Sequence, residues 1–127
     1  MYETQFTKIS KDRMIIKELQ KQVIKFRDAR DWKQFHNPKD LAVGLAAEIG
    51  EVLEHFQWKN GRELDNYLKK NKKAISEELA DVMHYVLLLA DHLKIDIEKA
   101  FLRKVKINEK RYPIRKSRGS SKKYTEL

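Results

Sequence analysis

Two pairs of acidic residues stand three positions apart, each within a segment whose apolar residues recur with helical spacing. The pairs are Glu48 with Glu51, and Glu78 with Asp81. Residues three apart share a helix face, and each pair lies beside its segment's apolar stripe. Carboxylates at the edge of a core are costly unless they are neutralised. One pair on each of two helices therefore favours a divalent cation between them, Mg²⁺ with Mn²⁺ as a substitute, because the chain has no Cys ligand.

The same residues have two other interpretations. Acidic residues make up 19 of 127, so pairs with this spacing also arise by chance on ordinary surface helices. A di-iron carboxylate bundle would need Glu-x-x-His motifs on two helices. The nearest approximation is Asp81 with His84, and helical geometry predicts that His84 points to the far side of its helix. Spacing and placement leave the hard-cation site and the chance pairing both open, and they disfavour di-iron.

Further along the chain, a cationic face could bind phosphate. Lys104, Asn108 and Arg111 stand at i, i+4 and i+7 and share a helix face with Ile97 and Phe101. Near a metal, such a cluster could hold a polyphosphate. The alternative is that the long side chains cover apolar surface with their stems.

Two tryptophans are candidates for stacking on a nucleobase. Trp32 and Trp58 each close a predicted helix near a connection. The tryptophans have two readings: anchors in a core or interface, or platforms on which a base stacks.

Helical periodicity and capping residues predict the elements that position these groups. We expect helices from a cap at Asp12 to about residue 31, from Pro38 to about Trp58, from 73–76 to about His92, and from Ile97 to about Tyr112. Asn37 and Asp96 are the expected caps of the second and fourth helices. Residues 62–73 are predicted to be a polar connection with a short helical turn. No segment has β-strand periodicity, so the predicted fold is all-α, a four-helix bundle.

Composition agrees with one helical domain, expected over residues 1–113, followed by a basic, flexible tail over 114–127. The chain is 41% hydrophobic and 37% charged, with 4 Gly and 2 Pro. Of the net charge of +9, residues 109–127 carry +5. No apolar run has the length of a membrane span or signal peptide, which predicts a cytoplasmic protein with no membrane partner. DNA or RNA binding by the tail is the alternative function, and nothing in the body supports it.

Taken together, several stretches carry a resemblance. Glu48-Ile49-Gly50-Glu51 and Glu78-Leu79-Ala80-Asp81, 26 residues apart, match a Glu-x-x-Glu, Glu-x-x-Asp pattern. The sequence resembles the MazG-like all-α NTP pyrophosphatases, which share this pattern, and within them the dCTP pyrophosphatase branch. The branch is matched by four longer stretches: FRDARDWKQFHNPKDL, GLAAEIGEVLEHFQWK, EELADVMHYVLLLA and KVKINEKRYP. The resemblance covers residues 18–127.

The resemblance implies a Mg²⁺-dependent enzyme that cleaves a dNTP between its α- and β-phosphates, in nucleotide-pool house-cleaning. It implies that Glu48, Glu51, Glu78 and Asp81 bind the metal and act in catalysis. Lys104, Asn108 and Arg111 would hold the phosphates, and Trp32, Trp58 and Tyr85 would form the base and sugar pocket. A catalytically silent nucleotide-binding relative would carry the same four carboxylates. His36 receives no role.

The resemblance also implies a homo-oligomer, a tetramer or dimer, with pockets completed by a neighbouring chain. Leu87 and Leu88 broaden the apolar surface of the third helix, which a partner could cover. Val23 stands where animal members have a pocket His. This departure leaves the base open: dCTP or a modified dCTP is expected, and another pyrimidine dNTP is the alternative.

Overall fold

The structure is a computed structural model that describes the backbone of residues 2–127 and the side chains of residues 15–127. These residues are helical with short connections and contain no strand, which confirms the predicted all-α fold. The α-helices are α1 (Tyr2–Ala29), α2 (Pro38–Glu54), α3 (Gly61–Lys70), α4 (Lys72–His92), α5 (Ile97–Arg111) and α6 (Ile114–Ser117). Two 3₁₀ turns, Lys33–Phe35 and Tyr124–Glu126, complete the sequence of elements.

The helix caps predicted at Asn37 and Asp96 are confirmed. The side chain of Asn37 accepts a hydrogen bond of 2.9 Å from the backbone N–H of Asp40, and Pro38 opens α2. Asp96 accepts one of 3.1 Å from the backbone N–H of Lys99 at the start of α5. Each cap satisfies a backbone donor that the first helical turn leaves free.

Three expectations about the helices were wrong. The second helix, α2, ends at Glu54 rather than at about Trp58. The first helix begins at Tyr2 rather than after Asp12, because no Gly or Pro interrupts the preceding residues; the side chain of Asp12 lies outside the described residues. Residues Gly61–Lys70 form a full helix, α3, rather than a short turn. Glu63 in its first turn and Lys69 and Lys70 in its last turn complement the helix dipole.

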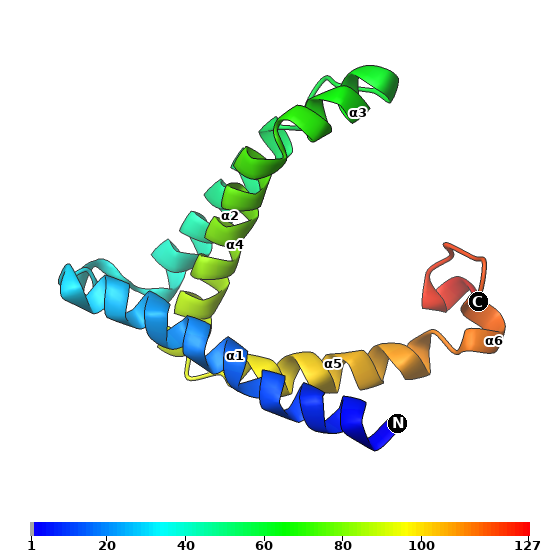
Figure 1. The fold of residues 1–127 in the computed structure, drawn as a ribbon, viewed down its shortest axis with the longest axis horizontal. Helices are drawn as coiled ribbons and strands as arrows, with labels where there is room; N and C mark the ends of the chain where they lie inside the picture. The colour runs from blue at the N-terminus through cyan, green and yellow to red at the C-terminus, as the bar shows by residue number, and fades with distance from the viewer. Residues whose placement is uncertain (1) are drawn as a thin grey trace. The chain divides into compact units, whose positions relative to one another are not determined.

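Residues 1–95 form one compact unit in which α4 contacts α1, α2 and α3. In Figure 1, α2 and α4 run side by side in opposite directions. Among the described side chains, the buried apolar residues are Leu41, Leu87, Leu88 and Ala90, each at most 5% exposed. The expectation that a partner chain covers Leu87 and Leu88 was wrong, because each is only 3% exposed in this chain. The neighbouring α1 supplies Gln20, whose Nε2 donates to the Leu87 carbonyl at 3.0 Å.

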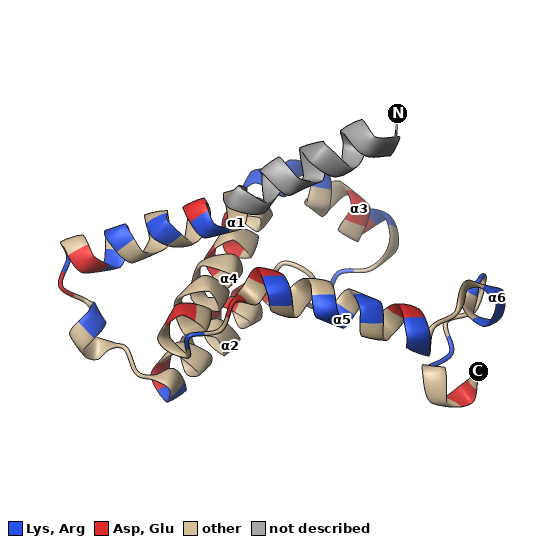
Figure 2. Ribbon diagram, turned by 90° about the horizontal axis from the view of Figure 1, so that it is seen from below, with Lys and Arg blue, Asp and Glu red and all other residues tan. Residues whose placement is uncertain are grey.

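Residues 96–127 form a second compact unit. Lys and Arg predominate along α5 and α6 (Figure 2). In this unit the Tyr124 ring packs edge-on against Tyr112 at 5.8 Å, and the Arg111 guanidinium lies 4.8 Å from the centre of the Tyr124 ring. These contacts tie the end of the chain to the end of α5, and the predicted flexibility of residues 114–127 stays a prediction. Within the described residues, no helix is both long and apolar enough to cross a membrane.

A buried ion pair joins α1 to α4. Arg27 is the one fully buried charged residue among the described side chains. Its Nε lies 2.8 Å from Asp28, and one terminal nitrogen lies 3.2 Å from Asp91 on α4. Hydrogen bonds to both carboxylates raise the pKa of Arg27 against the opposing effect of burial.

We expect Arg27→Met to lower the free energy of unfolding by about 2 kcal/mol, because it leaves the partly buried Asp91 without its cation. Urea unfolding measures this loss. Adding Asp91→Asn to Arg27→Met should recover part of it. Lys39→Met is the matched control: Lys39 pairs with Asp40 at the surface, and its loss should cost less than about 0.5 kcal/mol. Equal losses for Arg27→Met and Lys39→Met would contradict the role of the buried pair.

Candidate metal centre and adjoining cavity

The structure brings the four predicted carboxylates together. Glu48 and Glu51 project from α2, and Glu78 and Asp81 project from α4. One oxygen from each carboxylate lies within 4.8 Å of the corresponding oxygens of the other three. The arrangement follows from two i, i+3 pairs on antiparallel helices that lie in contact. Glu48 and Glu78 are half-buried, whereas Glu51 and Asp81 are exposed.

The four negative charges oppose one another. A hydrogen bond to Glu51, burial, and the charges of Glu51, Asp81 and Glu48 raise the pKa of Glu78 to about 7. Burial raises the pKa of Glu48, and a hydrogen bond to Glu51 and the charges of Glu51 and Asp81 add to this rise. Within the chain alone, these carboxylates are therefore held where negative charge is unfavourable.

Two buried oxygens in this cluster fit a cation. Oε2 of Glu48 and Oε2 of Glu78 are buried and have no hydrogen-bond partner among the described residues. A buried acceptor without a donor is costly, and a cation would satisfy both atoms and offset the repulsion. One oxygen from each of the four carboxylates lies within 4.8 Å of the others, so the four could serve together as oxygen ligands of one hard cation.

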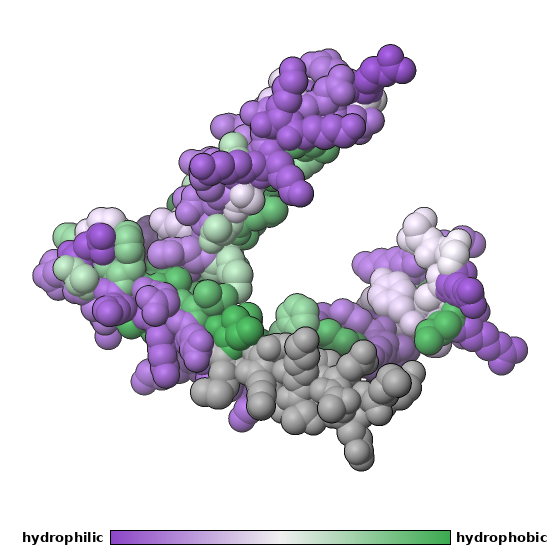
Figure 3. Space-filling model, in the orientation of Figure 1, coloured by the Kyte–Doolittle hydropathy of each residue, from purple (hydrophilic) through white to green (hydrophobic). Residues whose placement is uncertain are grey.

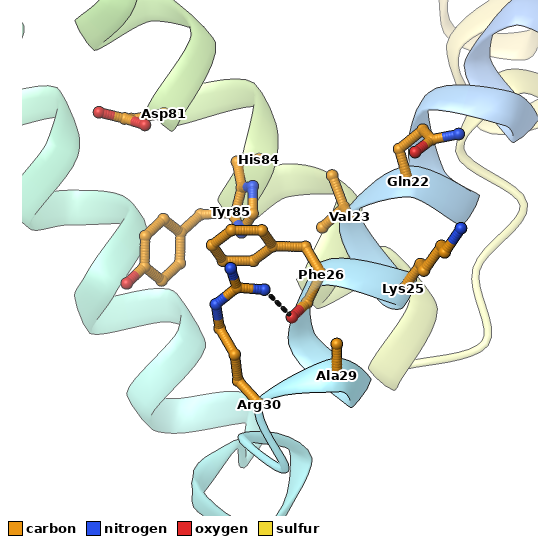
Figure 4. A pocket seen from close by; sticks show the side chains of 9 residues that line it. All are labelled: Gln22, Val23, Lys25, Phe26, Ala29, Arg30, Asp81, His84 and Tyr85. Atoms are coloured by element: carbon orange, nitrogen blue, oxygen red, sulfur yellow. Dashed lines mark hydrogen bonds between the residues drawn. The ribbon is translucent and has the colours of Figure 1, made fainter.

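A cavity of about 740 Å³ adjoins the acidic cluster between α1 and α4 (Figure 4). Its lining residues come from these two helices and from Arg30, which follows α1: Gln22, Val23, Lys25, Phe26, Ala29, Arg30, Asp81, His84 and Tyr85. Asp81 belongs to both the cavity and the cluster. A ligand bound in the cavity can therefore reach the carboxylates.

Aromatic rings form a connected wall beside this cavity. Phe26 packs edge-on against Trp32 at 5.7 Å and against His84 at 5.9 Å, and His84 packs against Tyr85 at 6.0 Å. The Arg30 guanidinium lies 3.6 Å from the centre of the Phe26 ring and donates a 2.9 Å hydrogen bond to the Phe26 carbonyl. Flat rings beside a cavity of this size suit a planar ligand.

The ring of Tyr85 packs against the backbone of α2. Figure 4 shows its ring extending from α4 toward α2. A Cβ atom at Gly44 of α2 would collide with the Tyr85 ring. Glycine at this position therefore lets the ring approach the α2 backbone and leaves its other side toward the cavity.

The structure does not bring Trp58 to Trp32 and Tyr85. Trp32 precedes α2 and Trp58 follows it, and a helix of 17 residues is about 25 Å long. Trp58 is 88% exposed and has a positive φ of 66°. Within one chain, the two tryptophans cannot contact the same base.

The predicted phosphate-binding residues Lys104, Asn108 and Arg111 lie on α5, in the unit formed by residues 96–127. All three side chains are exposed. Arg111 also contacts the Tyr124 ring. Their participation in one site with the carboxylates stays a prediction.

Sequence reasoning missed several cavity residues. His84 lies outside the acidic cluster, as its expected direction implied. The sequence did not show that this side of α4 is covered by α1, where His84 packs against Phe26 and lines the cavity together with Asp81. Phe26 and Arg30 were part of a matched stretch, but neither received a role. Val23, which by the resemblance stands where animal members of the family have a His, lines the same cavity. The signal available in the sequence was the i, i+3 relation of His84 to Asp81.

Comparison with known proteins identifies the family. The sequence profile of the MazG-like family matches residues 45–127, which include all four carboxylates. The chain belongs to the MazG-like family. It is 43% identical over 104 residues to dCTP pyrophosphatase 1 of Homo sapiens and 42% identical over 104 residues to that of Rattus norvegicus. Each alignment covers 80% of this chain and 61% of the relative, so the chain spans about three fifths of the length of these relatives.

A solved structure shows the same fold. The crystal structure of a pyrophosphatase from Archaeoglobus fulgidus is 40% identical in sequence, with a TM-score of 0.71. The match covers 76% of this chain and 91% of the archaeal chain. The MazG-like helical fold is therefore shared by proteins of comparable length.

The raised pKa of Glu78 predicts a pH dependence for the metal-free chain. Between its ordinary value of 4.5 and about 7, folded Glu78 holds a proton that the unfolded chain releases. Rising pH therefore favours unfolding across this window. In EDTA, we expect the melting temperature of the wild type minus that of Glu78→Gln to decrease as the pH rises from 5 to 8. Mg²⁺ at pH 8 should raise the melting temperature of the wild type more than that of the variant.

Differential scanning calorimetry measures both effects. Histidine titration is common to both proteins, so the difference between them isolates the cluster. Glu77→Gln is the control, because Glu77 is exposed and lies outside the cluster, and its curve should follow the wild type. If the melting temperatures of the wild type and Glu78→Gln changed in parallel with pH, the result would contradict a raised pKa of Glu78 in the folded chain.

Proposed function

We propose that the chain is a Mg²⁺-dependent nucleoside triphosphate pyrophosphohydrolase. It cleaves a dNTP, dCTP or a modified dCTP, between the α- and β-phosphates and releases the monophosphate and pyrophosphate. Another pyrimidine dNTP is the alternative substrate. The proposed role is house-cleaning of the nucleotide pool in the cytoplasm. The archaeal pyrophosphatase and the mammalian dCTP pyrophosphatases, at 40–43% identity, support this activity.

The main observation that supports this proposal is that Asp81 belongs both to the acidic cluster and to the lining of the aromatic cavity. A nucleoside triphosphate has a flat apolar base at one end and a polyanion at the other. The cavity between α1 and α4 suits the first end. The carboxylates cannot bind the second end directly, because both are negative, but they can do so through a cation. The two parts of the site thus correspond to the two ends of one substrate.

In this proposal the four carboxylates hold Mg²⁺, and the half-buried Glu48 and Glu78 contribute their unpartnered oxygens. Bound there, Mg²⁺ supplies neutralisation of phosphate charge and polarisation of the reacting groups. Glu51 is exposed at the cluster and is the candidate to accept the proton of the attacking water. Lys104, Asn108 and Arg111 are proposed to bind the phosphates as donors. Tyr85 and Trp32 help to form the base pocket.

A homo-oligomer, a dimer or tetramer, completes the proposal. Large apolar side chains of α2 and α4 reach the surface (Figure 3). Leu53 is 60% exposed and Leu79 is 54% exposed. A chain of this size normally buries a larger core than the residues buried here, and a second copy would cover these side chains. Trp58, about 25 Å along α2 from Trp32, would then serve the pocket of a neighbouring chain.

Removing single cluster charges tests the metal site. We expect Glu48→Gln and Asp81→Asn each to lower pyrophosphate release at least about 100-fold, because each removes a carboxylate that holds the cation. The assay follows pyrophosphate release from a panel of dNTPs and NTPs, with Mg²⁺ and with EDTA. Wild-type release should require Mg²⁺ and be strongest with dCTP. Circular dichroism should show unchanged helix content.

Two neighbouring glutamates provide matched controls. Glu54→Gln on α2 and Glu77→Gln on α4 make the same chemical change at exposed positions outside the cluster, and both should retain wild-type activity. Retained turnover in Glu48→Gln or Asp81→Asn would refute the metal site. Absence of release from every nucleotide by the wild type would refute the proposed activity.

Mixing two impaired variants tests whether Trp58 acts in a neighbouring pocket. Glu48→Gln keeps Trp58, and Trp58→Ala keeps the carboxylates but should raise KM for the preferred base. In a mixed dimer, one of the two sites would combine intact carboxylates with an intact tryptophan. Equal amounts that are unfolded and refolded together should therefore recover about one quarter of wild-type activity at low substrate. Activity equal to the mean of the two parents would show that Trp58 does not act across chains.

A further inference from the structure

His84 is the half-buried imidazole of the cavity, and the cluster and the proposed phosphate contacts leave it without a role. The other polar side chains of the cavity are placed differently. Asp81 belongs to the acidic cluster. Arg30 lies over the Phe26 ring and is hydrogen-bonded to the Phe26 carbonyl. Gln22 and Lys25 are exposed and extend away from the aromatic rings in Figure 4.

Two aromatic contacts fix the orientation of the His84 ring. The Phe26 ring meets it edge-on at 5.9 Å with an interplanar angle of 89°. The Tyr85 ring meets it at 6.0 Å with an angle of 62°. An imidazole held between rings presents its nitrogen atoms in a defined direction, as specific hydrogen bonding to a ligand requires.

His84 lies within one helical turn of the acidic cluster. Asp81 and His84 stand at i and i+3 on α4, so they share a face, and both line the cavity. A ligand whose phosphates reach the cluster therefore brings its base close to the imidazole. Stacking against aromatic rings does not discriminate well between bases, because every base has an aromatic face. Discrimination needs a hydrogen-bonding group at the base edge.

Resting on the proposed function, we propose that His84 recognises a pyrimidine bound in the cavity through a hydrogen bond to its C4 substituent, and so favours bases that carry an amine or carbonyl at C4 over those that carry neither. Burial lowers the pKa of His84 despite the opposing charge of Asp81, which favours an uncharged imidazole near neutral pH. An uncharged imidazole carries one donor and one acceptor nitrogen. It accepts from the C4 amine of cytosine, and in its other tautomer it donates to the C4 carbonyl of uracil or thymine.

The test pairs a change in the protein with a change in the substrate. His84→Phe keeps an aromatic ring against Phe26 and Tyr85 but removes both nitrogens. The matched substrates are dCTP and the analogue whose 2-pyrimidinone ring lacks the C4 amine. The wild type should prefer dCTP about tenfold in kcat/KM, the usual effect of one hydrogen bond. In His84→Phe, the kcat/KM values of the two substrates should differ by less than about twofold, because the variant has no imidazole to form the hydrogen bond with either substrate.

Two further variants separate hydrogen bonding from packing. His84→Gln restores a donor and an acceptor without the ring, and it should keep a preference for dCTP. His92→Phe makes the same chemical change at an exposed histidine of α4 outside the cavity, and it should behave as the wild type. Unchanged preference for dCTP in an active His84→Phe variant would overturn the proposal. So would equal loss of both substrates in His84→Phe and His84→Gln, which would indicate packing alone.

Binding of products distinguishes this proposal from the proposed function. Calorimetric titration with dCMP and with the 2-pyrimidinone monophosphate needs no hydrolysis, and the tenfold preference and its loss in His84→Phe should recur. A wild type that hydrolyses dCTP and binds both monophosphates equally would refute the role of His84 and leave the activity intact. A wild type that neither hydrolyses nor binds a nucleotide would refute both.

Discussion

The mutual repulsion of four carboxylates between α2 and α4 is the constraint on which the rest of the structure depends. Packing of the two helices brings Glu48, Glu51, Glu78 and Asp81 together. The resulting electrostatic repulsion contributes to the rise in the pKa of Glu78 to about 7. Without a cation, this arrangement does not stabilise the folded chain. A cation turns the same arrangement into a binding site, because the orphaned oxygens of Glu48 and Glu78 are then satisfied.

The sequence predicts the cluster because its determinants are local. Each carboxylate pair lies within one helical turn, and each helix has an apolar stripe that fixes which face turns inward. The caps at Asn37 and Asp96 were readable for the same reason, since each bonds to a backbone group three residues away. Local periodicity therefore suffices wherever one helix meets one neighbour.

Features that depend on a third element could not be predicted in this way. The helical pattern of α4 reveals the side that meets α2, but it does not show that α1 covers another side. That second contact buries Leu87 and Leu88 and turns His84 toward Phe26. Helix α3 was missed for a different reason. Asn60 and Gly61 were interpreted as the end of the second helix, but α2 ends at Glu54, and Asn60 is the N-cap of α3, which begins at Gly61.

Helix α4 joins two surfaces whose demands differ. Its Glu78 and Asp81 belong to the acidic cluster with α2, whereas its His84 and Tyr85 line the cavity with α1. In the proposed function, the first surface must suit a cation and the second a base. Substitutions on α1, such as at Val23, can therefore alter the cavity without moving the carboxylates. In the proposed function, a base that sits differently in the cavity would still have its phosphates directed to the same cluster, because Asp81 lies in both surfaces. In the proposed function, this arrangement separates the choice of base from the chemistry of cleavage.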